Sequence, residues 1–168
     1  MAGETIQANV ERWLREERIA FEPVADDAAL FHVSVVYPIE SPYRIDVVQP
    51  DRPHPDLLLV GSGVTVADDH RAAIARLTPD DRRDFLWDVC HLLAHRPAEF
   101  ELQHPNDVLE RFSVTAPLYE EELRKGTFIG ALREVHRTKL LGIWKIQEFG
   151  DEPEGPGFRS FRRDLGLS

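Results

Sequence analysis

The stretch TPDDRRDFLWDVCHLLAHR, from Thr78 to Arg96, decides how this chain can fold. Thr78 is a favourable N-cap residue, and Asp81 three positions later completes a pair that resembles a capping box. An acidic first turn and a last turn with histidine and arginine complement the dipole of a helix. The hydrophobic residues of the stretch recur with helical spacing and form one stripe: Phe85, Leu86, Val89, Leu92 and Leu93. The pattern therefore predicts a helix that covers a sheet with this stripe.

The segments around this helix predict strands before it and after it. In residues 30–37 the hydrophobic residues Phe31, Val33 and Val35 alternate with the polar His32 and Ser34, which is typical of a strand with one wet face. Similar reasoning predicts strands at 19–24, 43–48, 57–66, 98–103 and 108–115, the first at a sheet edge because it contains a proline. Helical periodicity predicts helices at 5–17, 70–77 and 118–149, the last divided by a glycine at position 126.

This order predicts an α+β fold, α-ββββ-αα-ββ-α, with an antiparallel sheet covered by helices. Residues 1–149 are predicted to form one domain. Residues 150–168 are rich in Gly, Pro and charge and are expected to be a flexible tail. The tail includes FRSFRR at 158–163, and aromatic and arginine residues of this kind favour an interface.

The composition narrows the class of partner and the compartment. The formal net charge is −10, from 20 basic and 30 acidic residues, which disfavours nucleic acid and anionic membranes. The single cysteine, Cys90, excludes an internal disulfide and suits a reducing compartment. Neither a signal peptide nor an apolar run of about 18 residues is present, so a cytoplasmic location is expected.

His91 and His95 are the strongest candidates for chemistry, because their spacing puts both imidazoles on one helix face. Leu92 stands where the zincin pattern needs a glutamate, and a third ligand would have to come from His70, His104 or His136. A metal-dependent, hydrolase-like enzyme is therefore the alternative hypothesis. Histidines at a helix C-terminus also serve the dipole without a metal, so we predict neither a metal site nor catalytic residues.

The segment Gly61-Ser62-Gly63 follows an apolar run, as a dinucleotide-binding loop would. Val66 occupies the third fingerprint position, and the residues after the segment favour a strand where a nucleotide-binding helix should start. We predict a β-bulge or bend at this segment and no cofactor. A small-molecule sensor that uses this loop remains a third possibility.

The last predicted helix points to a protein partner. Its end carries a wide apolar surface, formed by Leu140, Leu141, Ile143 and Trp144. One helix face can pack on the sheet, and the remaining apolar residues would be exposed unless a second chain or the tail covers them. The alternative is a helix sunk between the sheet and a neighbouring helix. The leading hypothesis is a non-enzymatic protein-interaction module that binds a protein segment or forms a homodimer.

Several stretches resemble an uncharacterised, mainly archaeal protein family: WLREE, FHVSVVYP, LLLVGSGVTV, DFLWDV and RTKLLGIWKIQ. The resemblance covers roughly residues 4–149 and carries no catalytic motif. The order of elements also resembles the fold of type III secretion chaperones, many of which are homodimers that bind extended segments of other proteins. This resemblance implies a chaperone-like role but no role in secretion.

Overall fold

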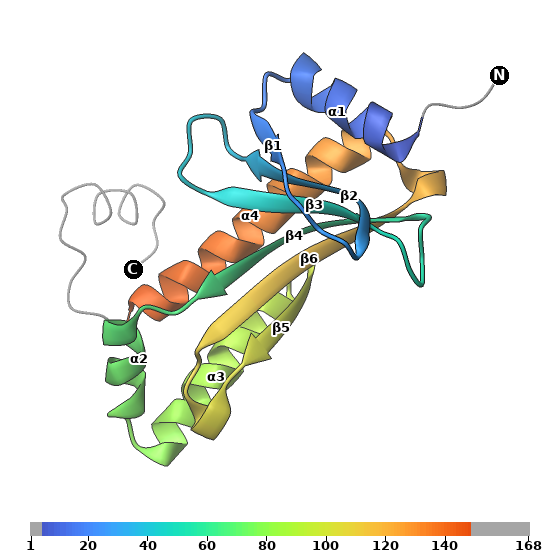
Figure 1. The fold of residues 1–168 in the computed structure, drawn as a ribbon. Helices are drawn as coiled ribbons and strands as arrows, with labels where there is room; N and C mark the ends of the chain where they lie inside the picture. Colours follow the sequence, from blue (N-terminus) through green and yellow to red (C-terminus); the bar gives the residue numbers. More distant parts are fainter. Residues whose placement is uncertain (1–4, 149–168) are drawn as a thin grey trace.

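The computed structural model of the protein describes residues 5–148. The predicted tail at 150–168 lies outside this range. Within it, the observed order is the predicted α-ββββ-αα-ββ-α. The helices are α1 (Ile6–Glu16), α2 (Asp68–Ala75), α3 (Pro79–Ala94) and α4 (Lys125–Gln147) (Figure 1). The strands are β1 (Phe21–Pro23), β2 (Ala29–Val36), β3 (Arg44–Pro50), β4 (Leu57–Thr65), β5 (Glu99–Gln103) and β6 (Arg111–Tyr119).

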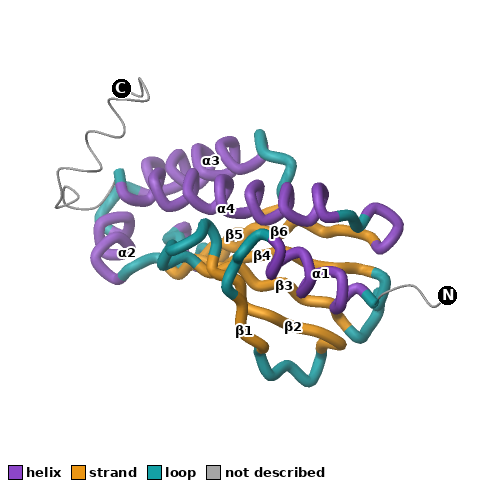
Figure 2. Tube along the Cα trace, turned by 90° about the horizontal axis from the view of Figure 1, so that it is seen from above, coloured by secondary structure: helices purple, strands orange, loops and turns teal. Residues whose placement is uncertain are grey.

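The strands form one six-stranded sheet in the order β1-β2-β3-β4-β6-β5, and every neighbouring pair is antiparallel. The proline-containing β1 lies at one edge, as predicted, and β5 lies at the other. The helices α1, α3 and α4 lie on one side of the sheet (Figure 2), so alternate residues of each strand are buried. The α+β fold with an antiparallel sheet is therefore confirmed.

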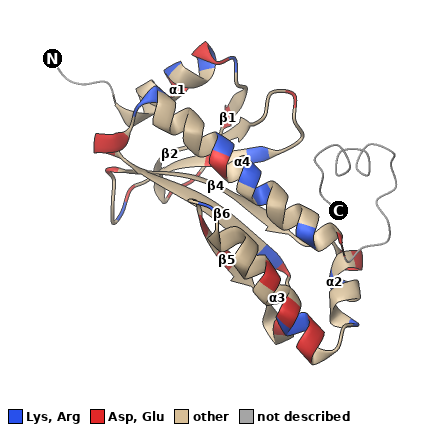
Figure 3. Ribbon diagram, turned by 180° about the vertical axis from the view of Figure 1, so that it is seen from behind, with Lys and Arg blue, Asp and Glu red and all other residues tan. Residues whose placement is uncertain are grey.

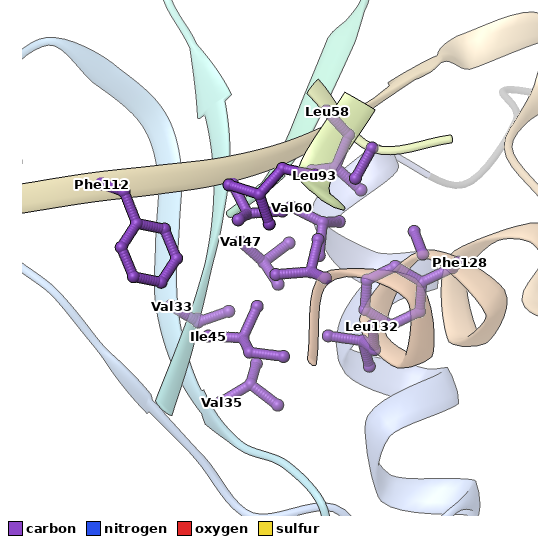
Figure 4. Close-up of a cluster of buried hydrophobic side chains, with 14 of the residues drawn as sticks. Val33, Val35, Ile45, Val47, Leu58, Val60, Leu93, Phe112, Phe128 and Leu132 are labelled. Atoms are coloured by element: carbon purple, nitrogen blue, oxygen red, sulfur yellow. The ribbon is translucent and has the colours of Figure 1, made fainter. Parts of the chain in front are cut away.

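The core lies between this face of the sheet and the helices. Val33, Val35, Ile45 and Val47 point from β2 and β3 toward Phe128 and Leu132 of α4, as Figure 4 shows. Leu58 and Val60 of β4, Phe112 of β6 and Leu93 of α3 belong to the same buried cluster. This arrangement leaves the other face of the sheet to solvent, as the strand alternation predicts.

The helix predicted from the opening stretch forms as expected. The Thr78 hydroxyl oxygen accepts a hydrogen bond from the Asp81 amide at 3.2 Å and donates one to the Asp81 carboxylate at 2.8 Å. Four residues of its apolar stripe are buried and Leu92 is half-buried. The helix α3 packs on α4 and on β5, so it covers one end of the sheet.

Two predicted details are wrong. Residues 61–63 form no β-bulge, because β4 pairs with β6 without a register shift from Leu57/Tyr119 to Thr65/Arg111. Residues 119–125 form no first helical segment, because β6 continues to Tyr119 and a short 3-10 turn (Glu120–Glu122) leads into α4. The pairing with β4 extends β6 to Tyr119, and the Glu120 amide donates to the Asp56 carbonyl oxygen at 2.8 Å, so no helix starts at Tyr119.

Candidate functional site

The outward side of α4 is the candidate site. Residues 133, 137, 140, 144 and 148 fall within a sector of about 80° on the helix, opposite the buried Val135 and Gly142. Arg133, Arg137 and Glu148 are exposed, and Leu140 and Trp144 are half-buried. Leu141 is also half-buried and borders this sector on the side of α3. The side facing away from the sheet is therefore partly hydrophobic and partly charged.

Of the predicted surface residues, Ile143 has a different position from the others. It packs against the hydrophobic core as a partly buried residue, whereas Leu140, Leu141 and Trp144 do not belong to that cluster. The helix is therefore more deeply buried on the side of Ile143 than on the side of Trp144. The wide stripe is thus packed at Ile143 and partly exposed at Leu140, Leu141 and Trp144, and its role as an interaction surface stays a prediction.

Contacts with three other elements hold α4 in place. Arg96, after the end of α3, forms a two-pronged ion pair with Glu134, at 3.1 and 2.6 Å. The Lys125 ammonium group lies 2.9 Å from the Glu16 carboxylate of α1. At Gly142 the helix lies so close to β6 that an added Cβ would stand 2.5 Å from the Phe112 ring. These contacts make the outward side of α4 a rigid platform.

A shallow hollow lies beside this platform, between α3 and α4. It has a volume of about 350 Å³ and is lined by Asp88, His91, Leu92, His95 and Lys145. The Lys145 ammonium group lies 3.7 Å from the Asp88 carboxylate. Trp87, on the outer side of α3, is 63% exposed, and its ring centroid lies 5.7 Å from that of His91.

The two histidines of the metal hypothesis are exposed on α3, and the structure brings no third histidine to them. His136 lies between Tyr37 and Tyr43, at ring distances of 5.9 and 5.8 Å, and His70 contacts Asp69. Within residues 5–148, no group of three His, Cys, Asp or Glu residues could hold a metal ion. Burial also raises the pKa of the Cys90 thiol, which disfavours a thiolate.

Sequence reasoning missed a buried polar contact between α4 and the sheet. The Lys139 ammonium group donates to the Ser62 hydroxyl at 3.0 Å and to the Arg44 carbonyl oxygen at 3.3 Å. It also lies 4.8 Å from the centre of the Tyr43 ring. Ser62 in turn donates to the Arg44 carbonyl oxygen at 3.0 Å. The signal was present, because Lys139 interrupts the apolar face that Val135 and Ile146 define.

The Lys139–Ser62 contact has a structural explanation. The pairing of β3 with β4 ends at Asp46 and Gly61, and Arg44 lies beyond that end, so its carbonyl oxygen needs other donors. Ser62 and Lys139 supply them. Their residues are only 8% and 5% exposed, which leaves a substrate no access to the hydroxyl. Burial lowers the pKa of Lys139, and the Asp46 carboxylate opposes this shift.

A second polar cluster lies on the solvent face of the sheet. His32 on β2 contacts Asp26 through Nδ1 at 2.9 Å and Asp46 through Nε2 at 3.0 Å. Partial burial by itself would lower the pKa of His32, but the hydrogen bonds to Asp46 and Asp26 outweigh it and raise the pKa. A hydrogen bond from His32 lowers the pKa of Asp26. The cluster ties the loop before β2 to β3.

This cluster should make stability depend on pH in a defined direction. The folded protein holds the His32 proton more tightly than the unfolded chain does. The stability that protonated His32 contributes is therefore complete below its ordinary pKa of 6.5. The contribution is lost as the pH rises through the raised, folded-state pKa. We expect urea unfolding from pH 5.5 to about pH 8.5 to show this loss in the wild type but not in His32→Gln. Since burial lowers the pKa of His136, which acts in the opposite sense, the difference between the two proteins is the quantity to follow. An identical pH profile for both would contradict the assignment.

Comparisons with known proteins place this architecture in a family. The model of a family described as an uncharacterised conserved protein (DUF2299) matches residues 6–146. The crystal structure of an uncharacterised protein from Methanothermobacter thermautotrophicus is 34% identical, with a TM-score of 0.80. That match covers 86% of this chain and 99% of the archaeal protein. The predicted resemblance to an uncharacterised family is therefore confirmed.

The remaining comparisons found only a distant structural match or no match. YbjN from E. coli has a TM-score of 0.49 at 13% identity, over 80% of this chain and 86% of that one, which is too distant to support an argument. No curated protein matches the chain. None of these matches shows a likeness to type III secretion chaperones. None of the described helices is both long enough and apolar enough to cross a membrane.

Proposed function

This chain belongs to the DUF2299 family of uncharacterised conserved proteins, and we propose that it is a non-enzymatic protein-interaction module. Its binding surface is the outward side of α4, with Leu140, Leu141 and Trp144 as contact residues and Ile143 at the border with the core. The observation that carries the proposal is that these large hydrophobic side chains stay partly exposed on a helix whose inner side is already fully packed.

Physical chemistry supports this role for the surface. Burial of the remaining exposed area of these Leu and Trp side chains by a partner is favourable. Tryptophan and arginine dominate the binding energy of protein interfaces, and Arg137 lies one helical turn from Leu141. The rigid attachment of α4 to the sheet and α3 reduces the entropy lost on binding. The element order, which resembles that of type III secretion chaperones, is consistent with a chaperone-like binder of protein segments.

Replacement of Trp144 by aspartate tests the surface. We expect Trp144→Asp to reduce protein binding about tenfold or more, because it removes the aromatic side chain that contributes the largest contact area of this surface. The wild type and the variant are each immobilised and exposed to an extract of cells that make this protein. The measurement compares the amounts of protein that the two capture. Circular dichroism of the variant confirms that the fold is retained.

Tyr119→Asp is the matched control. Tyr119 is an aromatic residue that is 45% exposed, and it lies on β6 on the opposite side of the sheet from α4. Capture by this variant should equal capture by the wild type. If both aspartate variants capture the same proteins as the wild type, the outward side of α4 is not the binding surface.

A further inference from the structure

We infer that the protein partner of α4 is a second copy of this chain, bound with its own α4 antiparallel and with a two-fold axis between Leu140 and Leu141. This inference rests on the proposed function of the surface and adds the identity of the partner and the register of the two helices.

The order of side chains along the outward sector carries the inference. Arg137 and Trp144 lie at equal distances on either side of the point between Leu140 and Leu141, and so do Arg133 and Glu148. In an antiparallel pair centred on this point, Leu140 faces the partner's Leu141. Arg137 then faces the partner's Trp144, and Arg133 faces the partner's Glu148. The surface is therefore complementary to itself.

Each facing pair is favourable in this register. A guanidinium group near a tryptophan ring forms a cation–π contact, which strengthens when the partner excludes water. Glu148 pairs with Lys145 of its own helix at 3.1 Å, and the partner's Arg133 would add a second cation to it at the rim of the interface. A two-fold axis repeats both contacts, because each pair occurs once in each direction. The leucines at the centre form a small apolar core, as interfaces of this kind require.

The distribution of charged residues also favours the antiparallel arrangement, and it favours the outward sector of α4 as the place of contact. A parallel two-fold pair would place Arg133 and Arg137 against the same residues of the partner, which is repulsive. Two copies with a formal charge of −10 repel each other over most of their surfaces. The outward sector of α4 has two exposed arginines and one exposed glutamate, and Figure 3 shows Lys and Arg along this helix. This sector is therefore one of the places where two acidic molecules can approach closely.

Charge reversal tests the register in the full chain. We expect the wild type to form a reversible dimer in sedimentation equilibrium. Arg133→Glu and Glu148→Arg should each weaken it roughly tenfold, because the two-fold axis converts two ion pairs into two repulsive contacts. The double variant, which restores opposite charges across the axis, should return to within about twofold of the wild type. Arg76→Glu, an exposed charge change at the end of α2, should have no effect.

The rescue has a single interpretation, because residues 133 and 148 are about 22 Å apart on one helix and cannot contact each other within one molecule. Trp144→Lys, which would place a second cation opposite the partner's Arg137, should break the dimer. If it does so but the charge-reversed double variant stays as weak as the single variants, the inferred register is overturned and the proposed surface stays intact. A monomer at every concentration would overturn the inference, and the capture experiment would still decide the proposed function. A dimer insensitive both to the charge reversals and to Trp144→Lys would overturn the inference and argue against the proposed surface.

Discussion

A leucine in place of Gly142 is expected to lower the free energy of unfolding by about 3 kcal/mol, near the upper end for overpacked cores. At this position a Cβ atom would stand 2.5 Å from Cζ and 2.8 Å from Cε2 of the Phe112 ring. Phe112 is fully buried, so its ring has no free space to enter. The helix must then move away from β6, and the contacts that α4 makes across the sheet are weakened together.

Gly130→Leu is the matched control on the same helix. No atom lies within 4 Å of a Cβ added at Gly130. Leucine favours a helix over glycine by about 0.8 kcal/mol, so this variant should be as stable as the wild type or slightly more stable. Urea denaturation measures both. Equal stability of the two variants would show that the close approach of α4 to β6 is not as described.

Replacement of Lys139 by methionine is expected to leave the protein as stable as the wild type at pH 7, or about 1 kcal/mol more stable. Methionine fills a similar volume without a buried ammonium group, and Ser62 still donates to the Arg44 carbonyl oxygen. Lys139→Ala should instead lose about 2 kcal/mol or more, because it leaves a cavity between α4 and the sheet. The contrast separates packing from charge at this position.

Lys139→Met should also change how the free energy of unfolding depends on pH. Because burial lowers the folded-state pKa of Lys139 below its ordinary value of 10.5, the unfolded chain binds a proton that the folded protein gives up in that interval. The free energy of unfolding should therefore rise with pH as 10.5 is approached from below, and this rise should be smaller in Lys139→Met. Denaturant midpoints at pH 8, 9 and 10 measure it. A steeper rise in the variant would contradict the assignment.

The parts of the fold that sequence reasoning predicted are those in which local signals and tertiary packing agree. Thr78 and Asp81 define the start of α3 whatever packs against it, and the alternation from Phe31 to Val35 requires one buried face. The errors arose where tertiary contacts decide. Residues 61–63 are rich in glycine but stay in register, because β6 pairs with them along its length.

The candidate site was predictable only in part. The hydrophobic residues near the end of α4 were evident from their spacing, but only the structure shows that Ile143 packs against the core while Leu140, Leu141 and Trp144 do not belong to that cluster. The contact of Lys139 with Ser62 joins residues 77 positions apart, and it depends on where the pairing of β3 with β4 ends. No local pattern in the sequence contains that information.

The central claim is that this protein binds other protein chains through the outward side of α4. Hydroxyl-radical footprinting of Trp144 tests it most directly, with the 63% exposed Trp87 on α3 as an internal reference. The oxidation rate of each tryptophan is measured in the dilute, unbound protein and again in the bound protein. The bound protein is either the dimer at high concentration or the complex with a protein found in the capture experiment. The account predicts that oxidation of Trp144 slows severalfold on binding while that of Trp87 is unchanged. Equal oxidation of Trp144 in the free and bound states would contradict it.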